Sequence, residues 1–485
     1  MPTPTSRTSP VAAAAAPPTR RRNPAPTPAE GSQEIQGAGT RSPSSRGRGH
    51  IGLVVLSSVA CGLVAALIWA LLVFGGSSEP TITGVILLGF SAGWAMLAVV
   101  SARRTDQPQR WAVAPAALMG LSGLGLAVSQ PSTSTVGALG WVWPPVLLAL
   151  VAWMVTQSRR WLHDWSRRAV LYPVFAALVA MAVGAGYQDI GQVQDRAALT
   201  MNGQLLDVGD HRLHIQCTGT GTPTVVLEGG LGEPSPAMAG WIAPAVAPIT
   251  RVCVYDRSGY AWSDPAPSPE GGRAVAADLH TLLAAADVAP PYVLAGHSSG
   301  GVYTRIFAGM YPTEVAGLVM LDAQPADVYT RLPGWRTFYS LYRRGEGLAP
   351  SLARLGIARI AYDIAPSGLP PTERAEEQAI LSTAAYYRAL HDEIAQLRTS
   401  LTQAQRVTGF GDTPLIVVTA GKNAQDGWLP LQDSMSRLST NSLHRILPDA
   451  THASLIEDQH DSAASVAAIT DVVHAVRSGR PLDAS

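Results

Sequence analysis

Five long apolar segments without a charged residue constrain this chain more than any other feature. They cover residues 51–74, 82–100, 111–128, 136–155 and 169–187. None of them contains Asp, Glu, Lys, Arg or His. Each is close to the length of about 20 residues that crosses a bilayer as a helix. The sequence therefore predicts a membrane region over residues 51–187, in which the fourth segment is the weakest because Pro144 and Pro145 interrupt it.

Arginine in the connecting loops predicts the orientation of these segments. The N-terminal tail and the loops 101–110 and 156–168 are rich in arginine, whereas the loop 75–81 carries a single glutamate and the loop 129–135 carries no charge. Arginine-rich loops stay on the cytoplasmic side of a membrane. We therefore expect a cytoplasmic N-terminus in the cell membrane, and five crossings place everything after residue 187 outside. An even number of crossings would reverse that side.

The tail itself, residues 1–50, is rich in Pro, Ala, Ser, Thr and Arg and poor in large apolar residues. A stretch of this composition cannot bury enough surface to offset its ordering entropy, so we expect it to be disordered. It either contacts anionic lipid or helps to set the topology as a solvated tail, and the second interpretation is favoured. The uncharged segments argue against an ion or proton pathway and favour an anchor.

Composition excludes several classes of protein. Only 14% of the residues are charged, against about 25% in soluble domains. Residues 1–198 carry 15 arginines against 7 acidic residues, and residues 199–485 carry 20 basic against 28 acidic residues. This balance excludes a strongly basic nucleic-acid binder, so no nucleic-acid partner is expected. Three cysteines are too few for a disulfide scaffold or a zinc cluster, and neither a metal nor an organic cofactor is expected.

From about residue 199 the pattern changes to short Val- and Ile-rich segments that alternate with helical stretches. Predicted strands cover 204–208, 212–217, 224–227, 251–255, 292–295, 317–321, 415–419 and 443–446. Predicted helices cover 273–286, 300–310, 429–438 and 463–476. This alternation predicts an α/β fold with a mostly parallel sheet. The helical insertion 325–412 is typical of a cap over a pocket, although it is also compatible with a purely structural elaboration.

Residues 296–300 read Gly-His-Ser-Ser-Gly, between a predicted strand and a predicted helix. The pattern G-x-S-x-G in this position predicts a sharp turn with a strained serine backbone, whose neighbours must be glycine to avoid clashes. Such a turn exposes the Ser298 hydroxyl at the carboxyl edge of the sheet, which makes Ser298 a candidate nucleophile.

With this motif the chain resembles the α/β-hydrolase superfamily over residues 199–478. The segments 227–232, 255–264 and 449–452 are similar to the family's pattern as well. The resemblance implies an eight-stranded, mostly parallel sheet with a helical cap, and the catalytic order nucleophile, acid, histidine. The membrane region lies outside the family pattern.

The resemblance implies roles for six residues. Ser298 would be the nucleophile, and His452, between the last strand and the last helix, would be the base. Asp322, at the end of the sixth strand, is the preferred acid, and Asp426, after the seventh, is the alternative. The backbone N–H groups of Leu231 and Ser299 would form the oxyanion hole. Gly229 stands where the family keeps a histidine, which leaves open how the loop of Leu231 is anchored.

The implied function is a membrane-anchored serine hydrolase that cleaves an ester, thioester or amide, and the cap and anchor suggest a lipophilic acyl substrate. A serine in the turn argues against the family's epoxide hydrolase and dehalogenase branches. An acyltransferase with the same triad and a non-catalytic receptor or scaffold stay open as alternatives. Cys217 and Cys253 fall on strands that are neighbours in the family's sheet, so an exterior domain would hold either a disulfide or two buried thiols.

Overall fold

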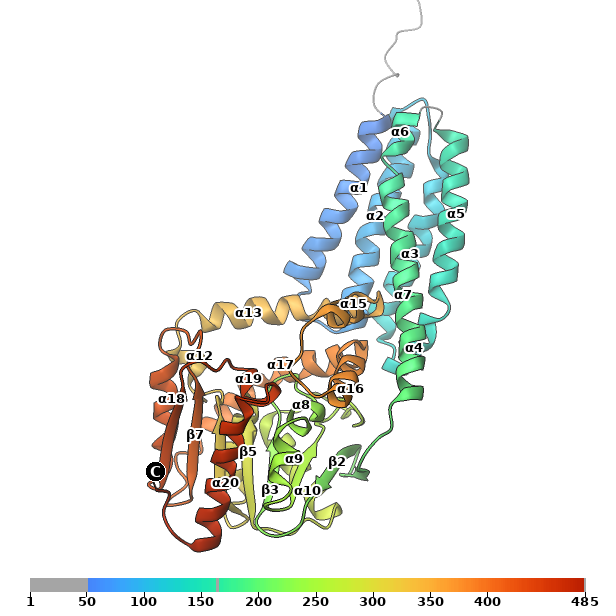
Figure 1. The fold of residues 1–485 in the computed structure, drawn as a ribbon. Helices are drawn as coiled ribbons and strands as arrows, with labels where there is room; N and C mark the ends of the chain where they lie inside the picture. Colours follow the sequence, from blue (N-terminus) through green and yellow to red (C-terminus); the bar gives the residue numbers. More distant parts are fainter. Residues whose placement is uncertain (1–50, 163–164, 484–485) are drawn as a thin grey trace, which may run out of the picture. The chain divides into compact units, whose positions relative to one another are not determined.

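The computed structural model describes residues 51–162 and 165–483, and the tail that was expected to be disordered, residues 1–50, lies outside the described residues. A bundle of apolar helices is followed by an α/β domain with a helical insertion (Figure 1). The fold class expected from the sequence is therefore confirmed.

The bundle consists of apolar helices that agree with the predicted segments. Their bounds are α1 Ile51–Leu67 continued by η1 Ile68–Val73, α2 Glu79–Arg104, η2 Arg110–Ala112, α3 Val113–Ser129, α4 Thr133–Gly140, α5 Trp143–Trp161, α6 Trp165–Ala169 and α7 Tyr172–Ala198. Four of the described helices are long and apolar enough to cross a membrane, and a fifth span is formed if α4 and α5, bent by 46°, count as one.

The bend falls where the sequence contains two prolines. Pro144 and Pro145 occupy the first turn of α5 rather than the middle of a helix. Proline is tolerated there because the first backbone N–H groups of a helix have no acceptor within it. The predicted fourth segment is thus broken just before these prolines.

Small residues bring the first three helices close together. A Cβ atom added at Gly89 of α2 would lie 2.5 Å from the Ala66 nitrogen of α1, and one added at Gly84 would lie 2.6 Å from the Gly123 oxygen of α3. Close approach of this kind stabilises helix pairs where no hydrophobic effect drives their association.

The α/β domain is built on one sheet of eight strands. The strands are β1 Gln204–Asp207, β2 Arg212–Thr218, β3 Thr224–Glu228, β4 Val252–Tyr255, β5 Tyr292–His297, β6 Val315–Leu321, β7 Leu415–Ala420 and β8 Ser442–Leu447. Their order is β1-β2-β4-β3-β5-β6-β7-β8. The pairs β1·β2 and β2·β4 are antiparallel, and all later pairs are parallel.

Helices cover both faces of the sheet, so its central strands are buried on both sides. One face packs on α10 Gly272–Ala285, α11 Gly300–Met310 and α18 Trp428–Ser436, and the other on α8 Ser235–Ala239, α9 Ile242–Val246, α19 Ser454–Glu457 and α20 Ser462–Ser478. Along β3, Val226 faces the first layer, whereas Val225 and Leu227 face the second. This double burial explains the nearly continuous apolar segments of the sequence.

Between β6 and β7 the chain forms six helices, which we call the cap. They are α12 Val328–Arg331, α13 Trp335–Glu346, α14 Ala349–Arg354, α15 Ile357–Ile364, α16 Pro371–Leu381 and α17 Ala384–Gln405.

Polar contacts join the cap to the bundle. The buried carboxylate of Glu79, in the first turn of α2, pairs with Arg354 of α14 and with Arg388 of α17. At the end of α7, Asp195 accepts a hydrogen bond of 2.6 Å from Arg359 of α15. The cap therefore lies between the apolar helices and the sheet (Figure 1).

Candidate active site

Ser298 lies in the turn between β5 and α11, with a backbone φ of +53°. Non-glycine residues rarely adopt this conformation, and the surrounding hydrogen bonds hold it in place. The Ser298 N–H donates to the Leu321 carbonyl at 3.1 Å, and its carbonyl accepts from the Gln324 N–H at 2.7 Å. The strain expected from the G-x-S-x-G pattern is therefore present.

The two glycines of the motif are required by the backbones around them. A Cβ added at Gly296 would lie 2.6 Å from the Gly300 carbonyl carbon, and one added at Gly300 would lie 2.3 Å from the Glu228 oxygen. Only glycine fits at either position, because real Cβ atoms do not approach a backbone so closely.

The structure brings Asp322 and His452 together. Asp322 follows β6 directly, and its Oδ2 lies 2.6 Å from His452 Nδ1. Its Oδ1 accepts a hydrogen bond of 2.8 Å from the indole N–H of Trp428. The Asp322 side chain is 5% exposed and that of His452 is 46% exposed. Asp426 is exposed to solvent and does not contact His452 in the described part of the chain.

His297 contacts both the backbone and the ring of His452. Its Nε2 lies 3.0 Å from the His452 carbonyl, and the two ring centroids are 4.5 Å apart. Between the described side chains of Ser298 and His452 there is no hydrogen bond, as is common for catalytic pairs before substrate binds. The Asp322 contact occupies Nδ1 of His452, which leaves Nε2 as the nitrogen that can accept a proton.

The two predicted oxyanion donors lie on the loops that flank the serine. Among the described residues, neither the Leu231 N–H nor the Ser299 N–H donates a hydrogen bond to the protein. Gly230 carries the loop past the serine, since a Cβ added there would lie 2.7 Å from Ser298 Cβ. Two free N–H groups near one serine are what a developing oxyanion requires.

Arg257 and Glu233 anchor the loop of Leu231, in place of the histidine that Gly229 replaces. The Arg257 guanidinium donates to the carbonyls of Gly229 at 2.6 Å and of Gly230 at 2.5 Å. The Glu233 carboxylate accepts the Gly230 N–H at 2.5 Å and lies 2.8 Å from Nδ1 of the buried His297. Sequence reasoning missed Glu233 and Trp428; the acidic residue shortly after the glycine pair was the one local signal for Glu233.

Charge stabilises the contact between Glu233 and His297. Burial raises the pKa of Glu233, but the neighbouring His297 and the Gly230 N–H outweigh it and leave the pKa below its ordinary value. Burial lowers the pKa of His297, but the Glu233 carboxylate outweighs it and leaves the pKa raised. The lowered pKa of Glu233 and the raised pKa of His297 both favour a carboxylate–imidazolium pair at the residue next to the candidate nucleophile.

Arg257 also joins the sheet to the cap. It lies between Glu228, at the end of β3, and Glu393 of α17, at N–O distances of 2.7 and 3.0 Å. Burial raises the pKa of Glu228 in spite of the arginine. Hydroxyl groups of Tyr260 and Tyr303 donate to Glu393 at 2.6 and 2.9 Å. Arg257, within the segment 255–264 that is similar to the family pattern, therefore braces the candidate site.

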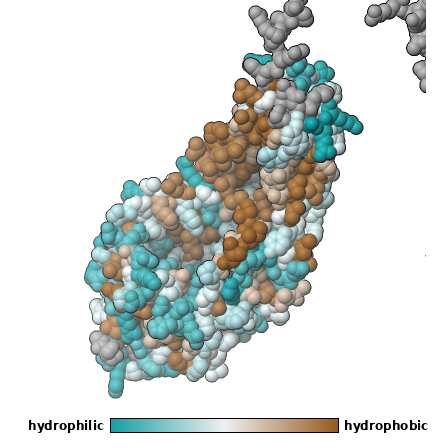
Figure 2. Space-filling view, turned by 45° about the horizontal axis from the view of Figure 1, so that its top comes forward, coloured by the Kyte–Doolittle hydropathy of each residue, from teal (hydrophilic) through white to brown (hydrophobic). Residues whose placement is uncertain are grey.

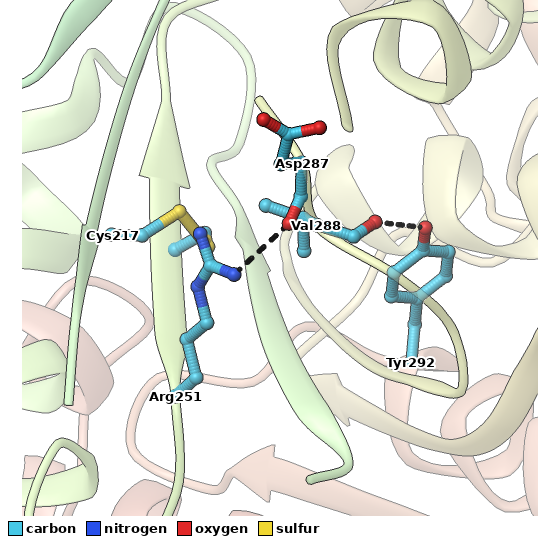
Figure 3. Close-up of a disulfide and its surroundings, with 6 residues drawn as sticks. Cys217, Arg251, Asp287, Val288 and Tyr292 are labelled. Atoms are coloured by element: carbon cyan, nitrogen blue, oxygen red, sulfur yellow. Dashed lines mark hydrogen bonds between the residues drawn. A yellow bond between two sulfur atoms is a disulfide. The ribbon is translucent and has the colours of Figure 1, made fainter. Parts of the chain in front are cut away.

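A disulfide joins Cys217 and Cys253, which are paired residues of the antiparallel strands β2 and β4, with Cα atoms 4.0 Å apart. The sequence left this pairing open. Figure 3 shows the bond beside Arg251, whose guanidinium donates to the Asp287 carbonyl at 3.2 Å. The disulfide joins β2 to β4, and β3 lies between β4 and β5, the strand that Ser298 follows.

A crevice of about 1450 Å³ lies between the bundle and the α/β domain. Its lining includes Glu79, Tyr260 and Arg388, but not Ser298, Asp322 or His452. The crevice therefore does not contain the three candidate catalytic side chains, but it reaches Arg257 and Glu393, which brace the loop of Leu231.

A serine turn, an Asp–His pair and a mostly parallel sheet with a cap define a hydrolase-type domain. Residues 223–459 match the family model described as alpha/beta hydrolase fold, and this part of the chain has that fold. Four or five apolar helices precede it. The resemblance inferred from the sequence is confirmed at this level.

Similar proteins include several without an assigned activity. An uncharacterized protein of Schizosaccharomyces pombe is 31% identical over 296 residues, which are 54% of this chain and 54% of that protein. A probable transporter of Hormonema carpetanum is 31% identical over 27% of this chain and 20% of its own. The uncharacterized protein YbdG of Bacillus subtilis is 26% identical over 33% of this chain and 50% of its own. The chain thus spans about half, or less, of the length of these curated relatives.

Three solved structures have a similar fold. A putative lipase from Acinetobacter baumannii is 19% identical, with a TM-score of 0.45, over 61% of this chain and 97% of its own. A thermophilic esterase from Thermogutta terrifontis is 23% identical, with a TM-score of 0.41, over 55% of this chain and 94% of its own. The Cif epoxide hydrolase from Acinetobacter nosocomialis is 15% identical, with a TM-score of 0.49, over 59% of this chain and 96% of its own.

Proposed function

We propose that the protein is a membrane-anchored serine hydrolase that cleaves an ester, thioester or amide through an acyl-enzyme on Ser298. The observation that carries this proposal is the pairing of His452 with the buried Asp322, at 2.6 Å, beside a serine with a φ of +53°. In this arrangement Ser298 is the nucleophile, His452 the base and Asp322 the acid.

The proposed reaction has two halves. The Ser298 oxygen attacks the acyl carbon and its proton passes to His452 Nε2, while Asp322 stabilises the imidazolium through Nδ1. The N–H groups of Leu231 and Ser299 stabilise the oxyanion. His452 then returns the proton to the leaving group, and the acyl-enzyme forms. Water, deprotonated by the same histidine, attacks the acyl carbon and releases Ser298.

The surface of the bundle supports a membrane anchor. Figure 2 shows hydrophobic residues gathered over the bundle and mostly hydrophilic ones over the α/β domain. Large apolar side chains on its helices are exposed, among them Leu53, Leu72, Leu121 and Val183, each at least 60%. Such a surface is stable in lipid rather than in water.

The positions of charges and the disulfide support the proposed orientation. Arg103 and Arg104 end α2, whereas Glu79 begins it, which places the arginines on the side of the N-terminus. By the positive-inside rule this side is cytoplasmic. The disulfide between Cys217 and Cys253 is compatible with an exterior α/β domain, because disulfides persist in oxidising compartments.

The cap supports a lipophilic substrate. On α13, Phe338 and Leu341 are 52% and 66% exposed, and on α15, Ile360 and Ile364 are 52% and 80% exposed. The cap is joined to the exterior end of the bundle, so these apolar side chains lie near the lipid surface. We infer that acyl substrates reach the site from the membrane.

The proposal is tested with a fluorophosphonate probe that cannot cross membranes, applied to intact cells that express the full chain. We expect labelling of the wild type and of Ser268→Ala, an exposed serine outside the site, and none of Ser298→Ala. Labelling only after lysis would support the hydrolase and overturn the orientation. Equal labelling of Ser298→Ala, or none in lysed cells that contain folded protein, would overturn the proposed mechanism.

A further inference from the structure

Three side chains with metal-binding atoms meet on the face of the sheet that α10 covers. His211 lies in the turn between β1 and β2, Glu270 precedes α10, and Asp278 lies within α10. One imidazole nitrogen and one oxygen of each carboxylate all lie within 4.8 Å of one another. Residues that are far apart in the sequence thus place a nitrogen and two oxygens around one point.

His211 is oriented towards this point by a fourth residue. Its Nδ1 lies 2.6 Å from the Asp210 carboxylate, which acts as acceptor and fixes the proton on Nδ1. The Nε2 atom then carries no proton and presents a lone pair. The His211 side chain is only 2% exposed, and its Nε2 is buried without a hydrogen-bond partner among the described residues.

The lone pair faces a carboxylate oxygen that is also without a hydrogen-bond partner among the described residues. The Oδ2 atom of Asp278 lies 3.8 Å from His211 Nε2, too far for a hydrogen bond, and is likewise buried and unpaired in the described part of the chain. Neither Glu270 nor Asp278 pairs there with an arginine or lysine. Buried acceptors that face one another are costly unless a cation or a proton lies between them.

We propose that His211, Glu270 and Asp278 bind a divalent transition-metal cation of the Zn²⁺ type. A mixed set of one imidazole and two carboxylates suits Zn²⁺ better than Ca²⁺ or Mg²⁺, which prefer oxygen ligands alone. Asp210 supplies the carboxylate that commonly orients a metal-bound histidine. The Asp278 side chain is 19% exposed, so water can complete the coordination.

The position of the site indicates a structural role. The turn that holds His211 belongs to the hairpin β1–β2, which follows the membrane helix α7, and α10 packs against β1. A cation there would hold the edge of the sheet to α10. It would not touch Ser298, so this proposal is independent of the proposed catalytic activity.

The test uses the full, untagged chain in detergent, stripped with EDTA and titrated with Zn²⁺, Mn²⁺, Ca²⁺ and Mg²⁺ by calorimetry and by thermal unfolding. We expect one equivalent of Zn²⁺ to bind and to raise the unfolding midpoint. The variants Glu270→Gln and Asp278→Asn should bind at least tenfold more weakly. The control Asp461→Asn, in the exposed group Asp458, His460 and Asp461, should bind as the wild type does.

Two results overturn the proposal: a wild type that binds no Zn²⁺, which leaves a shared proton between the carboxylates, and site variants that bind as tightly as the wild type. If the variants do not fold, Co²⁺ added to the wild type decides. A visible spectrum distinct from that of aqueous Co²⁺ and bleached by EDTA supports the site, and the spectrum of the aqueous ion alone refutes it.

Discussion

Two residues at the ends of neighbouring strands share an unusual backbone. Ser298 follows β5 with a φ of +53°, and Asp322 follows β6 with a φ of +40°. Hydrogen bonds to the adjacent strand hold both, from Ser298 N–H to Leu321 and from Asp322 N–H to Val418. The sheet thus over-determines the two positions that the proposed chemistry needs, which is how strain persists at functional sites.

Gly230 lies so close to Ser298 that there is no room for a methyl group, and we expect the substitution Gly230→Ala to lower the activity severely. Gly230→Ala would place a Cβ 2.7 Å from Ser298 Cβ and 2.8 Å from a Glu233 oxygen. The loop would move and carry the Leu231 N–H away, so we expect hydrolysis of a p-nitrophenyl ester to fall by about 10²–10³-fold. Gly345→Ala is the control, since nothing lies within 4 Å of its added Cβ. Unchanged activity of Gly230→Ala would contradict the assigned oxyanion loop.

The choice between two acids is decided by exchanging each for its amide. Asp322→Asn keeps the shape of the side chain, but its amide N–H would donate to His452 Nδ1 and favour the wrong tautomer of the imidazole. We therefore expect kcat to fall by about 10⁴-fold. Asp426→Asn, on an exposed loop, should change kcat less than twofold. Ester hydrolysis by both variants gives the answer, and a larger loss in Asp426→Asn would reverse the assignment.

Site residues that belong to a local sequence motif could be predicted. Site residues that are recognised only by their contacts with distant parts of the sequence could not. A glycine-flanked serine, and an aspartate and a histidine that each follow a strand, are visible in the sequence. Trp428 donates to Asp322 across 106 positions, and Glu233 reaches His297 across 64 positions. The ligands His211, Glu270 and Asp278 have no common spacing either, which is why the sequence indicated no metal.

Among the elements, the cap helix α16 brings a carboxylate close to the site. Glu377 of α16 lies near Glu457 and Glu233, and burial followed by these two charges raises its pKa to about 8.

The strands were readily predicted, because parallel strands that are buried on both faces are short, continuously apolar and rich in β-branched residues. The short helices α8, α9 and α19 were missed, since four or five residues show no helical period.

The raised pKa of Glu377 predicts a pH-dependent stability. The unfolded carboxyl ionises near its ordinary pKa of 4.5, but the folded one ionises only near 8. Its contribution to stability is therefore present below pH 4.5 and is lost as the pH rises to about 8. We expect Glu377→Gln to raise the unfolding midpoint at pH 8.5 by a few degrees, about 2–4 °C for each kcal/mol gained, and to leave it unchanged at pH 4.5.

Thermal unfolding at the two pH values provides the measurement, with Glu373→Gln, on the same helix, as the matched control. An equal shift at both pH values would show that Glu377 acts by packing rather than by ionisation.

At the scale of the whole molecule, the disulfide closes a loop of 36 residues that contains β3, α8, α9 and the oxyanion loop. Loop-closure entropy predicts a stabilisation of about 4 kcal/mol for a loop of this size. Replacing both Cys217 and Cys253 by serine should lower the unfolding midpoint by about 10 °C. Differential scanning fluorimetry in detergent tests this against Cys61→Ser, whose thiol lies outside the α/β domain. Equal midpoints for all three proteins would contradict it.

The helix α17 contacts both the apolar bundle and the loop of Leu231. Arg388 of α17 forms an ion pair with Glu79 in the first turn of α2. Glu393, five positions later, forms an ion pair with Arg257 and accepts the Gly232 N–H at 3.3 Å. Five positions on a helix are about 7.5 Å. Both contacts lie on one continuous stretch of α17, so the helix connects them rigidly. A displacement of α2 relative to the α/β domain would therefore act on the loop that holds the Leu231 N–H through these two contacts.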